Sequence, residues 1–238
     1  MAGGMRIAVC VPHYGPLNAR FVASLTQMIA ATAGRDVNFN GELVRPRIIP
    51  LFAESGPLDY KRTLLVKRAR EQGAHYIQWI DNDQTFPADA SLKLARHDLP
   101  IVGCNYVQRN GPPQPTAMGL DGAWVATVEA KGDAVERVAS VGFGFCLMKA
   151  QVFDQIAQPW FTTELGPDGE VVRSDDLHFG CRRRKRACRS SSITDSPATL
   201  GMSRRWSATI RKWKAPAEPG RRRRKRWLGR TDGIGAGS

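Results

Sequence analysis

Short apolar runs and amphipathic stretches alternate along the first part of the chain, and each predicts one kind of element. Residues 6–12 form an apolar, β-branched run that predicts a strand, and residues 43–52 predict a second extended segment. Residues 21–33 and 58–72 repeat apolar side chains at helical spacing. The pattern of a buried strand returns at residues 76–80. This alternation of strands and helices predicts a doubly wound α/β fold.

The helix predicted at residues 58–72 is rich in basic side chains. Leu65 lies on its predicted apolar face, whereas the basic residues, including Lys61 and Arg62, are expected mostly on its other faces. Gly73 is expected to end the helix.

Further elements are predicted after residue 87. They are a helix at 88–96, a strand at 99–106, an antiparallel hairpin formed by 124–128 and 135–141, a glycine-containing strand at 141–149 and a helix at 150–156.

An acidic turn follows the apolar run 76–80, where the sequence reads Asp81-Asn82-Asp83. Ligands of doubly wound folds bind at the carboxyl ends of the strands. Two carboxylates one residue apart at such an end can share a magnesium or manganese ion, and phosphate oxygens then complete its coordination. The turn therefore predicts an Asp-x-Asp site for a nucleoside diphosphate. The alternative is that both aspartates are solvent-facing turn residues.

The chain of 238 residues, 42% of them hydrophobic, is long enough for one α/β domain with a buried core. No apolar run reaches the length of a membrane span, and the first residues lack the features of a secretory signal, so a cytoplasmic protein is expected. The five cysteines are odd in number and have no CxxC spacing, which argues against a disulfide framework and against a zinc site.

The net charge of +13 is unevenly distributed along the chain. Residues 1–180 contain 17 Lys and Arg against 19 Asp and Glu, a net charge of −2. Residues 181–238 contain 18 against 3, a net charge of +15. Because only the C-terminal segment is basic, the two pieces imply different partners and are interpreted separately.

Five short segments follow one another within residues 5–180. They are Val11-Pro12 with Tyr14; Arg62-Thr63 and the turn Ile80-Asp81-Asn82-Asp83; Gly142-Phe143-Gly144-Phe145; and Ser174-Asp175-Asp176-Leu177-His178-Phe179. In this order they resemble the GT-A glycosyltransferases, most closely the bacterial and phage members of the inverting family two, which is typified by cellulose and chitin synthases. The resemblance implies a GT-A fold, in which a mixed sheet is flanked by helices.

The resemblance also implies a donor site for a nucleoside-diphosphate sugar. Pro12, Tyr14, Arg62 and Asp81 would bind the nucleotide, and Asp83 with Asp81 would hold magnesium or manganese. A metal at this position would neutralise the leaving diphosphate. Thr63 stands where the family often has Asn, which leaves the preference for a particular donor open.

On the acceptor side, the resemblance implies that Gly142, Phe143 and Gly144 line the site for a glycan or another hydroxyl acceptor. Inverting transfer needs a base near that hydroxyl. Asp176 is the candidate base and Asp175 its partner, although Asp175 stands where Glu is usual. The alternative is that the two aspartates cap a helix beginning at Leu177.

Residues 181–238 have no sustained hydrophobic periodicity and contain many Arg, Ser and Gly. Permitted codons for residues 187–215, read one base out of frame from the last base of the Arg186 codon, give GVPVFIDHRLSRHVGHVAEVVSHDTEVEG. This reading contains a strand-like run and an HVGH segment, the continuation that the glycosyltransferase resemblance implies. The hypothesis is that a one-base frameshift near Gly180 replaced the native C-terminal part and left a disordered basic tail.

Two other functions are compatible with the sequence. The runs of Arg and Lys at 182–186 and 221–226, interleaved with tryptophans, would bind nucleic acid without sequence preference if the tail is a functional arm. A metal-dependent nucleotidyltransferase would share the acidic turn, and transfer of a nucleotide instead of a sugar would identify it.

Overall fold

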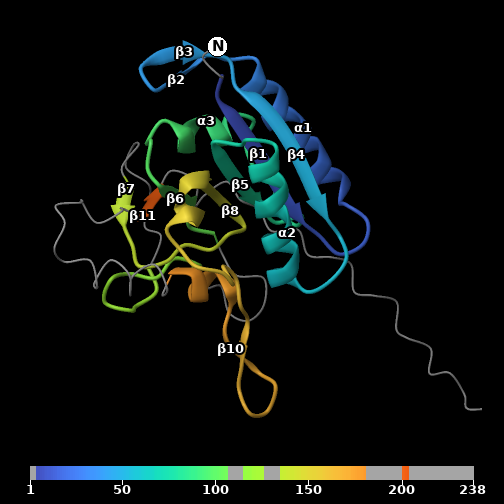
Figure 1. Cartoon of the computed structure of the whole chain (residues 1–238), viewed down its shortest axis with the longest axis vertical. Helices are drawn as coiled ribbons and strands as arrows, with labels where there is room; N and C mark the ends of the chain where they lie inside the picture. The colour runs from blue at the N-terminus through green and yellow to red at the C-terminus, as the bar shows by residue number, and fades with distance from the viewer. Residues whose placement is uncertain (1–3, 107–114, 126–134, 181–199, 204–238) are drawn as a thin grey trace, which may run out of the picture.

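The computed structural model describes residues 4–106, 115–125, 135–180 and 200–203 of the chain (Figure 1). Its elements, in chain order, are β1 (Arg6–Pro12), α1 (Ala19–Ala33), β2 (Val37–Phe39), β3 (Glu42–Val44), β4 (Arg47–Ala53), α2 (Leu58–Glu71), β5 (Tyr76–Ile80), α3 (Ala90–Ala95), β6 (Ile101–Cys104), β7 (Val135–Arg137), β8 (Phe145–Lys149), the 3-10 helix η1 (Ala150–Asp154), β9 (Glu164–Leu165), β10 (Val171–Arg173) and β11 (Leu200–Ser203). Residues 175–180 are also helical.

The main sheet has seven strands in the order β4-β1-β5-β8-β6-β11-β7. Strand β1 is parallel to β4 and β5, whereas β8 is antiparallel to both β5 and β6. The carboxyl ends of β1, β4, β5 and β6 and the amino end of β8 therefore lie at one edge of the sheet. The prediction of an α/β fold with a mixed sheet flanked by helices is confirmed.

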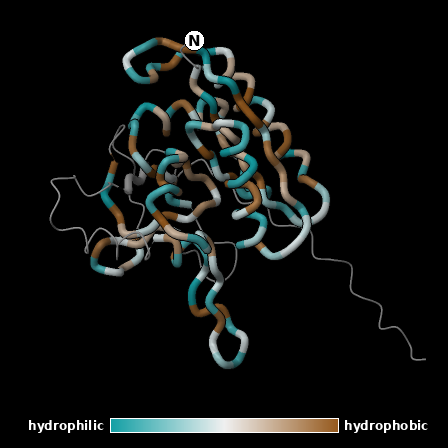
Figure 2. Tube along the Cα trace, viewed as in Figure 1, coloured by the Kyte–Doolittle hydropathy of each residue, from teal (hydrophilic) through white to brown (hydrophobic). Residues whose placement is uncertain are grey.

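Both faces of the sheet are buried. For this reason the sequence of β1 is almost continuously apolar. Ala8 and Cys10 point to the face that α2 covers, where they join Leu65 in one core cluster. Ile7 and Val9 point to the opposite face, in a second cluster that includes residues from α1 and α3. Figure 2 shows stretches of hydrophobic residues, interspersed with hydrophilic ones, along the chain.

Helix α1 begins at Ala19, two residues before the predicted start, because Asn18 caps it. The Asn18 side chain accepts a hydrogen bond from the backbone N–H of Arg20 at 2.8 Å. Asparagine is a favoured residue at this position, since its side-chain oxygen satisfies one of the free N–H groups of the first turn.

The prediction that Lys61 and Arg62 lie away from the buried face of their helix is wrong. Both residues are buried in α2, at 0% and 3% exposure. The first turns of α2 face the loops at the carboxyl edge of the sheet instead of the apolar core. Lys61 Nζ donates hydrogen bonds there to the carbonyl oxygens of His13 at 2.7 Å and Glu54 at 3.1 Å.

Several predicted elements are shorter or of another type. The 3-10 helix η1 replaces the predicted helix at 150–156, and β8 begins at Phe145, after the two glycines. For the predicted hairpin, Met118 makes isolated bridges to Trp124 and Ser140, while residues 126–134 lie outside the described residues.

Strand β11 is an element that the sequence analysis does not predict. It pairs in parallel with β6 and antiparallel with β7, so four residues of the basic segment belong to the sheet. Both the proposed frameshift and the predicted disorder include residues 200–203, which form β11. The rest of that segment, residues 181–199 and 204–238 with both basic runs, lies outside the described residues.

No helix within the described part of the chain is both long and apolar enough to cross a membrane.

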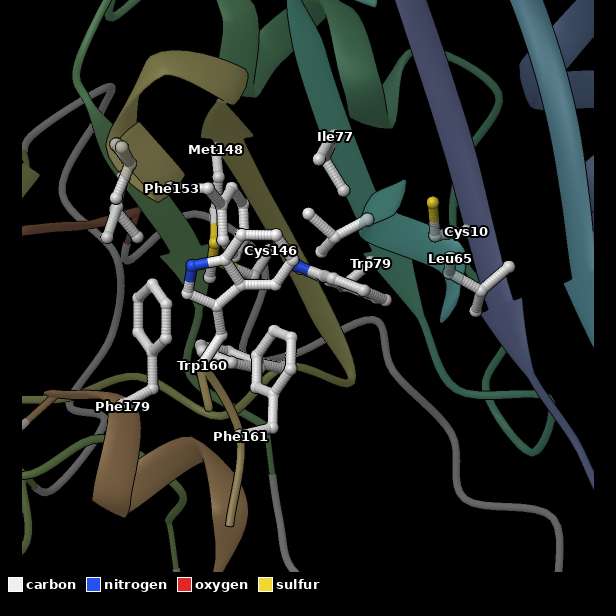
Figure 3. Close-up of a cluster of buried hydrophobic side chains, with 14 of the residues drawn as sticks. Cys10, Leu65, Ile77, Trp79, Cys146, Met148, Phe153, Trp160, Phe161 and Phe179 are labelled. Carbon is white, nitrogen blue, oxygen red and sulfur yellow. The ribbon is translucent and has the colours of Figure 1, made fainter. Parts of the chain in front are cut away.

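An aromatic cluster connects the helical residues 175–180 to the core (Figure 3). The Phe179 ring centroid lies 5.4 Å from that of Phe143, and 5.5 Å from those of Phe153 and Phe161. Phe179 is 1% exposed. The packed domain therefore includes the chain up to this helix.

Replacing Phe179 by Ala is expected to lower the free energy of unfolding by about 3–5 kcal/mol, because it removes a large side chain from a packed core. Chemical denaturation measures the loss. Val172→Ala is the control, since Val172 is 69% exposed, and a change within about 0.5 kcal/mol is expected there. Equal effects of the two substitutions would contradict the placement of Phe179 in the core.

Candidate active site

Several predicted site residues meet at the carboxyl edge of the sheet. Asp81 directly follows β5, and its backbone N–H donates to the carbonyl oxygen of Gly144, just before β8, at 2.9 Å. The helical residues 175–180 approach the same edge and bring Asp175 to Arg62 of α2. Strand pairing, helix packing and one buried ion pair thus assemble the site.

Arg62 is the cation at the centre of this cluster. Its Nη1 lies 2.9 Å from Asp175 Oδ2, and both side chains are 4% exposed. Its Nη2 lies 3.8 Å from Oδ1 of Asp81, whose side chain is 33% exposed. The cation therefore stands between a buried carboxylate and a carboxylate that reaches solvent.

Aromatic rings cover the guanidinium of Arg62. Its Cζ lies 5.0 Å from the ring centroid of Phe143 and 5.9 Å from that of Trp79. These two rings are stacked, with centroids 6.3 Å apart and planes inclined by 11°. Such contacts attract a cation most strongly where water is excluded.

Some buried polar atoms of the cluster have no hydrogen-bond partner among the described residues. They include Arg62 Nε and Nη1, Asp175 Oδ2 and Trp79 Nε1. The close approach of Arg62 to Asp175 is therefore an ion pair without hydrogen-bond geometry. Unsatisfied polar atoms are costly inside a protein, so the cluster is held at some cost in stability.

Burial raises the pKa of Asp81 to about 6; Arg62 opposes this shift, while Asp83, Asp176 and Asp175 add to it. Burial also raises the pKa of Asp175, again against the effect of Arg62. For Arg62, burial alone lowers the pKa, but the surrounding carboxylates outweigh it and hold the pKa above its ordinary value. Arg62 therefore stays charged and compensates the two carboxylates.

Asp81 and Asp83 are the residues that could hold a divalent metal. No group of three or more His, Cys, Asp or Glu side chains in the described ranges is arranged to hold one. Magnesium and manganese sites that serve phosphates often use only one or two carboxylates, with water and phosphate oxygens as the other ligands. The two aspartates supply the ligand type that such a site needs, and they do not form an all-protein metal cage.

The predicted nucleotide loop follows β1 at the same edge. Pro12 ends the strand, and the backbone N–H of His13 donates to the carbonyl oxygen of Ala53 at 2.9 Å. The side chain of Tyr14 is 64% exposed. Lys61 Nζ lies 2.8 Å from its ring centroid, so one ring face is covered by a buried lysine.

Asp176 lies at the start of the helical residues 175–180, half-buried. Its Oδ1 accepts a short hydrogen bond from Ser174 Oγ and another from the Leu177 N–H at 2.8 Å. One oxygen of Asp176 thus contributes to the start of the helix, which begins at Asp175 and not at Leu177.

Gly142, Phe143 and Gly144, predicted to line the acceptor site, are all buried. A Cβ on Gly142 or on Gly144 would lie 2.5 Å from the Tyr106 hydroxyl oxygen. The two glycines thus allow Tyr106 to pack against this backbone.

Tyr106 is a site residue that the sequence analysis missed. Its hydroxyl oxygen accepts a hydrogen bond from the Gly144 N–H at 2.7 Å. Burial, followed by the charges of Asp81 and Asp176, raises the pKa of Tyr106 well above its ordinary value. The available signal was its position two residues after β6, a strand that runs parallel to β5, because both strands end at the same edge.

A second missed group links the β9–β10 hairpin to the helical residues 175–180. Glu164 Oε1 lies 2.8 Å from His178 Nδ1, and Arg173 Nη1 donates to both Glu164 oxygens at 2.9 Å. The hairpin projects from the body of the protein (Figure 1). This contact ties its base to the helix that carries Asp175 and Asp176.

Comparison with solved structures finds the same fold in very different sequences. A197 from STIV has a TM-score of 0.52 and 10% identity, over 89% of this chain and 87% of its own. GalNAc-T7, solved with UDP, GalNAc and Mn2+, has a TM-score of 0.51 and 8% identity. That match covers 87% of this chain and 44% of the GalNAc-T7 chain.

These identities show a shared fold alone, and the mixed sheet is similar to that of a GT-A glycosyltransferase. No protein-family model and no curated protein sequence matches the chain.

Tyr106→Phe is expected to destabilise the protein by about 1–3 kcal/mol, because it leaves the buried Gly144 N–H without its acceptor. Thermal and urea unfolding measure the change. Tyr60→Phe removes the same atom from a side chain that is 56% exposed, and it is expected to change stability by less than about 0.5 kcal/mol. A neutral Tyr106→Phe would contradict a structural role for this hydroxyl.

Proposed function

We propose that this chain transfers a sugar from a nucleoside-diphosphate sugar to an acceptor hydroxyl, with the help of a divalent metal. The observation that carries the proposal is the placement of Asp81 and Asp83 directly after β5, at the edge where Arg62, Asp175 and Asp176 also gather. A donor diphosphate and an acceptor would both have to reach this edge.

The similarity to GalNAc-T7 supports the proposal at the level of fold and suggests the first ligands to test. That protein was solved with UDP and Mn2+. The donor base and sugar used by this chain are not implied by a likeness of 8% identity.

On the donor side, Asp83 and Asp81 would hold magnesium or manganese. The metal, when bound, supplies positive charge to the leaving diphosphate. The exposed face of Tyr14 would contact the nucleobase, while Lys61 holds the ring from its other face.

On the acceptor side, Asp176 would accept the proton of the attacking hydroxyl. Asp175 is less suited to that role, because it is almost fully buried and paired with Arg62. Asp176 is half-buried and its charge contributes to the electrostatics of Arg62 and Asp81, so it belongs to the same cluster.

We also propose that residues 5–180 form the glycosyltransferase-like unit and that a one-base frameshift altered the segment after it. Strand β11 adds to the sheet without supplying the HVGH segment of the shifted reading. An independent nucleotide read across the codons for Ser174 to Arg189 tests this. An uninterrupted frame there would exclude the frameshift and favour a genuine basic arm.

Asp83→Ala is expected to weaken Mn2+-dependent binding of UDP by at least about 10-fold, because even changes around metal ligands typically cost 10–100-fold. Isothermal titration with UDP and Mn2+ measures the effect, and omission of Mn2+ should have the same result. Asp168→Ala is the control, since it removes an exposed carboxylate from the hairpin turn.

Unchanged UDP binding by Asp83→Ala would remove the metal-dependent donor site from the proposal. If UDP binds, product analysis with UDP-sugars decides the reaction. Release of UDP with a glycosylated product supports sugar transfer, whereas a product carrying the nucleotide would identify a nucleotidyltransferase.

A further inference from the structure

The Arg62 side chain connects three parts of the chain that are distant in sequence. It extends from α2 to Asp175, at the start of the helical residues 175–180, and to Asp81 after β5. Its guanidinium also lies over the ring of Phe143, before β8. The same cation thus contacts the donor side and the acceptor side of the edge.

The position of Arg62 is poorly suited to direct binding of a diphosphate. Only 4% of its side chain is exposed, and its closest charged partner is Asp175 at 2.9 Å. A phosphate would have to displace that carboxylate and leave it buried without compensation. Breaking one side of a buried ion pair is strongly unfavourable.

The contact is instead suited to holding the helical residues 175–180 in place. The Arg62–Asp175 pair connects them to α2, the His178–Glu164 contact connects them to the β9–β10 hairpin, and Phe179 packs into the apolar core. The pair holds Asp175 in place. Because Asp176 is the next residue of the same helix, its backbone position is held as well.

We propose that Arg62 is a positioning residue, which pairs with Asp175 to hold Asp176 at the acceptor side, and not a ligand of the nucleotide. The role given to Asp176 rests on the proposed glycosyltransferase function. The ion-pair lock, by which the Arg62–Asp175 pair holds residues 175–180 in place, does not.

Amide hydrogen exchange in the absence of any nucleotide tests the lock. Arg62→Met removes the charge and keeps the length of the side chain, and Asp175→Asn removes the partner charge with little change in shape. Each is expected to speed exchange in residues 175–180 by at least about 10-fold, since local opening requires less free energy once the pair is lost. Arg68→Met, on an exposed position of the same helix, is the matched control and should leave this exchange unchanged.

The double variant Arg62→Met/Asp175→Asn tests whether the two residues act together. It removes both charges of the pair, so that neither Arg62 nor Asp175 is left as an unpaired buried charge, and its exchange in residues 175–180 is expected to be no faster than in either single variant. Additive effects would overturn the pairing. If Arg62→Met does not fold, Asp175→Asn and the double variant still decide the question.

Binding of UDP with Mn2+ separates positioning from nucleotide contact. The affinity of Arg62→Lys and of Asp175→Asn for UDP is expected to stay within about threefold of that of the parent protein. This is less than the tenfold change in Kd that corresponds to about 1.4 kcal/mol. In a transfer assay, Arg62→Lys should lower kcat and leave the donor KM unchanged. Loss of UDP affinity in Arg62→Lys with normal exchange in residues 175–180 would overturn the proposal.

The experiments distinguish a failure of the proposed function from a failure of the ion-pair lock. A parent protein that does not bind UDP with Mn2+ contradicts the proposed function, yet the exchange measurements still test the ion-pair lock. Normal exchange in both single variants contradicts the lock even if the protein proves to be a glycosyltransferase.

Discussion

A charged guanidinium that is almost completely removed from water must be compensated by nearby carboxylates, and Arg62 imposes this constraint on the site. Asp175 meets it at 2.9 Å, and Asp81 contributes from 3.8 Å. Because the two carboxylates come from different segments, Arg62 is compensated by both only when α2, the end of β5 and the helical residues 175–180 are all in place. The aromatic rings beside the cation exclude water and make this dependence stronger.

The sheet explains why these segments meet. Parallel β1, β4, β5 and β6 all end at one edge, and antiparallel β8 begins there. This edge receives the loop with Tyr14, the acidic turn and Tyr106, while the glycines before β8 leave room for the Tyr106 ring. The fold is shared with solved structures at 10% and 8% identity, so very different sequences form it.

Much of this architecture could be predicted because apolar periodicity reports directly on strands and helices. The acidic turn was predicted on the same basis, since a buried strand ending in Asp81 and Asp83 is visible along the chain. Local sequence patterns did not predict the burial of Lys61 and Arg62. Basic residues of a helix are usually exposed, and here burial becomes favourable because loops and carboxylates from distant parts of the sequence pair with them. Strand β11 was missed because its four residues become a strand by pairing with β6 and β7.

The sequence by itself determined the fold class, the order of the main elements and the residue types available for the proposed metal-dependent donor site. It also showed that the basic charge is confined to residues 181–238. The tertiary structure alone decided that Arg62 pairs with Asp175, that Tyr106 supports Gly144 and that Glu164 contacts His178. These contacts join residues far apart in sequence or on different elements, and their energy depends on burial and distance, which no local pattern of residues encodes.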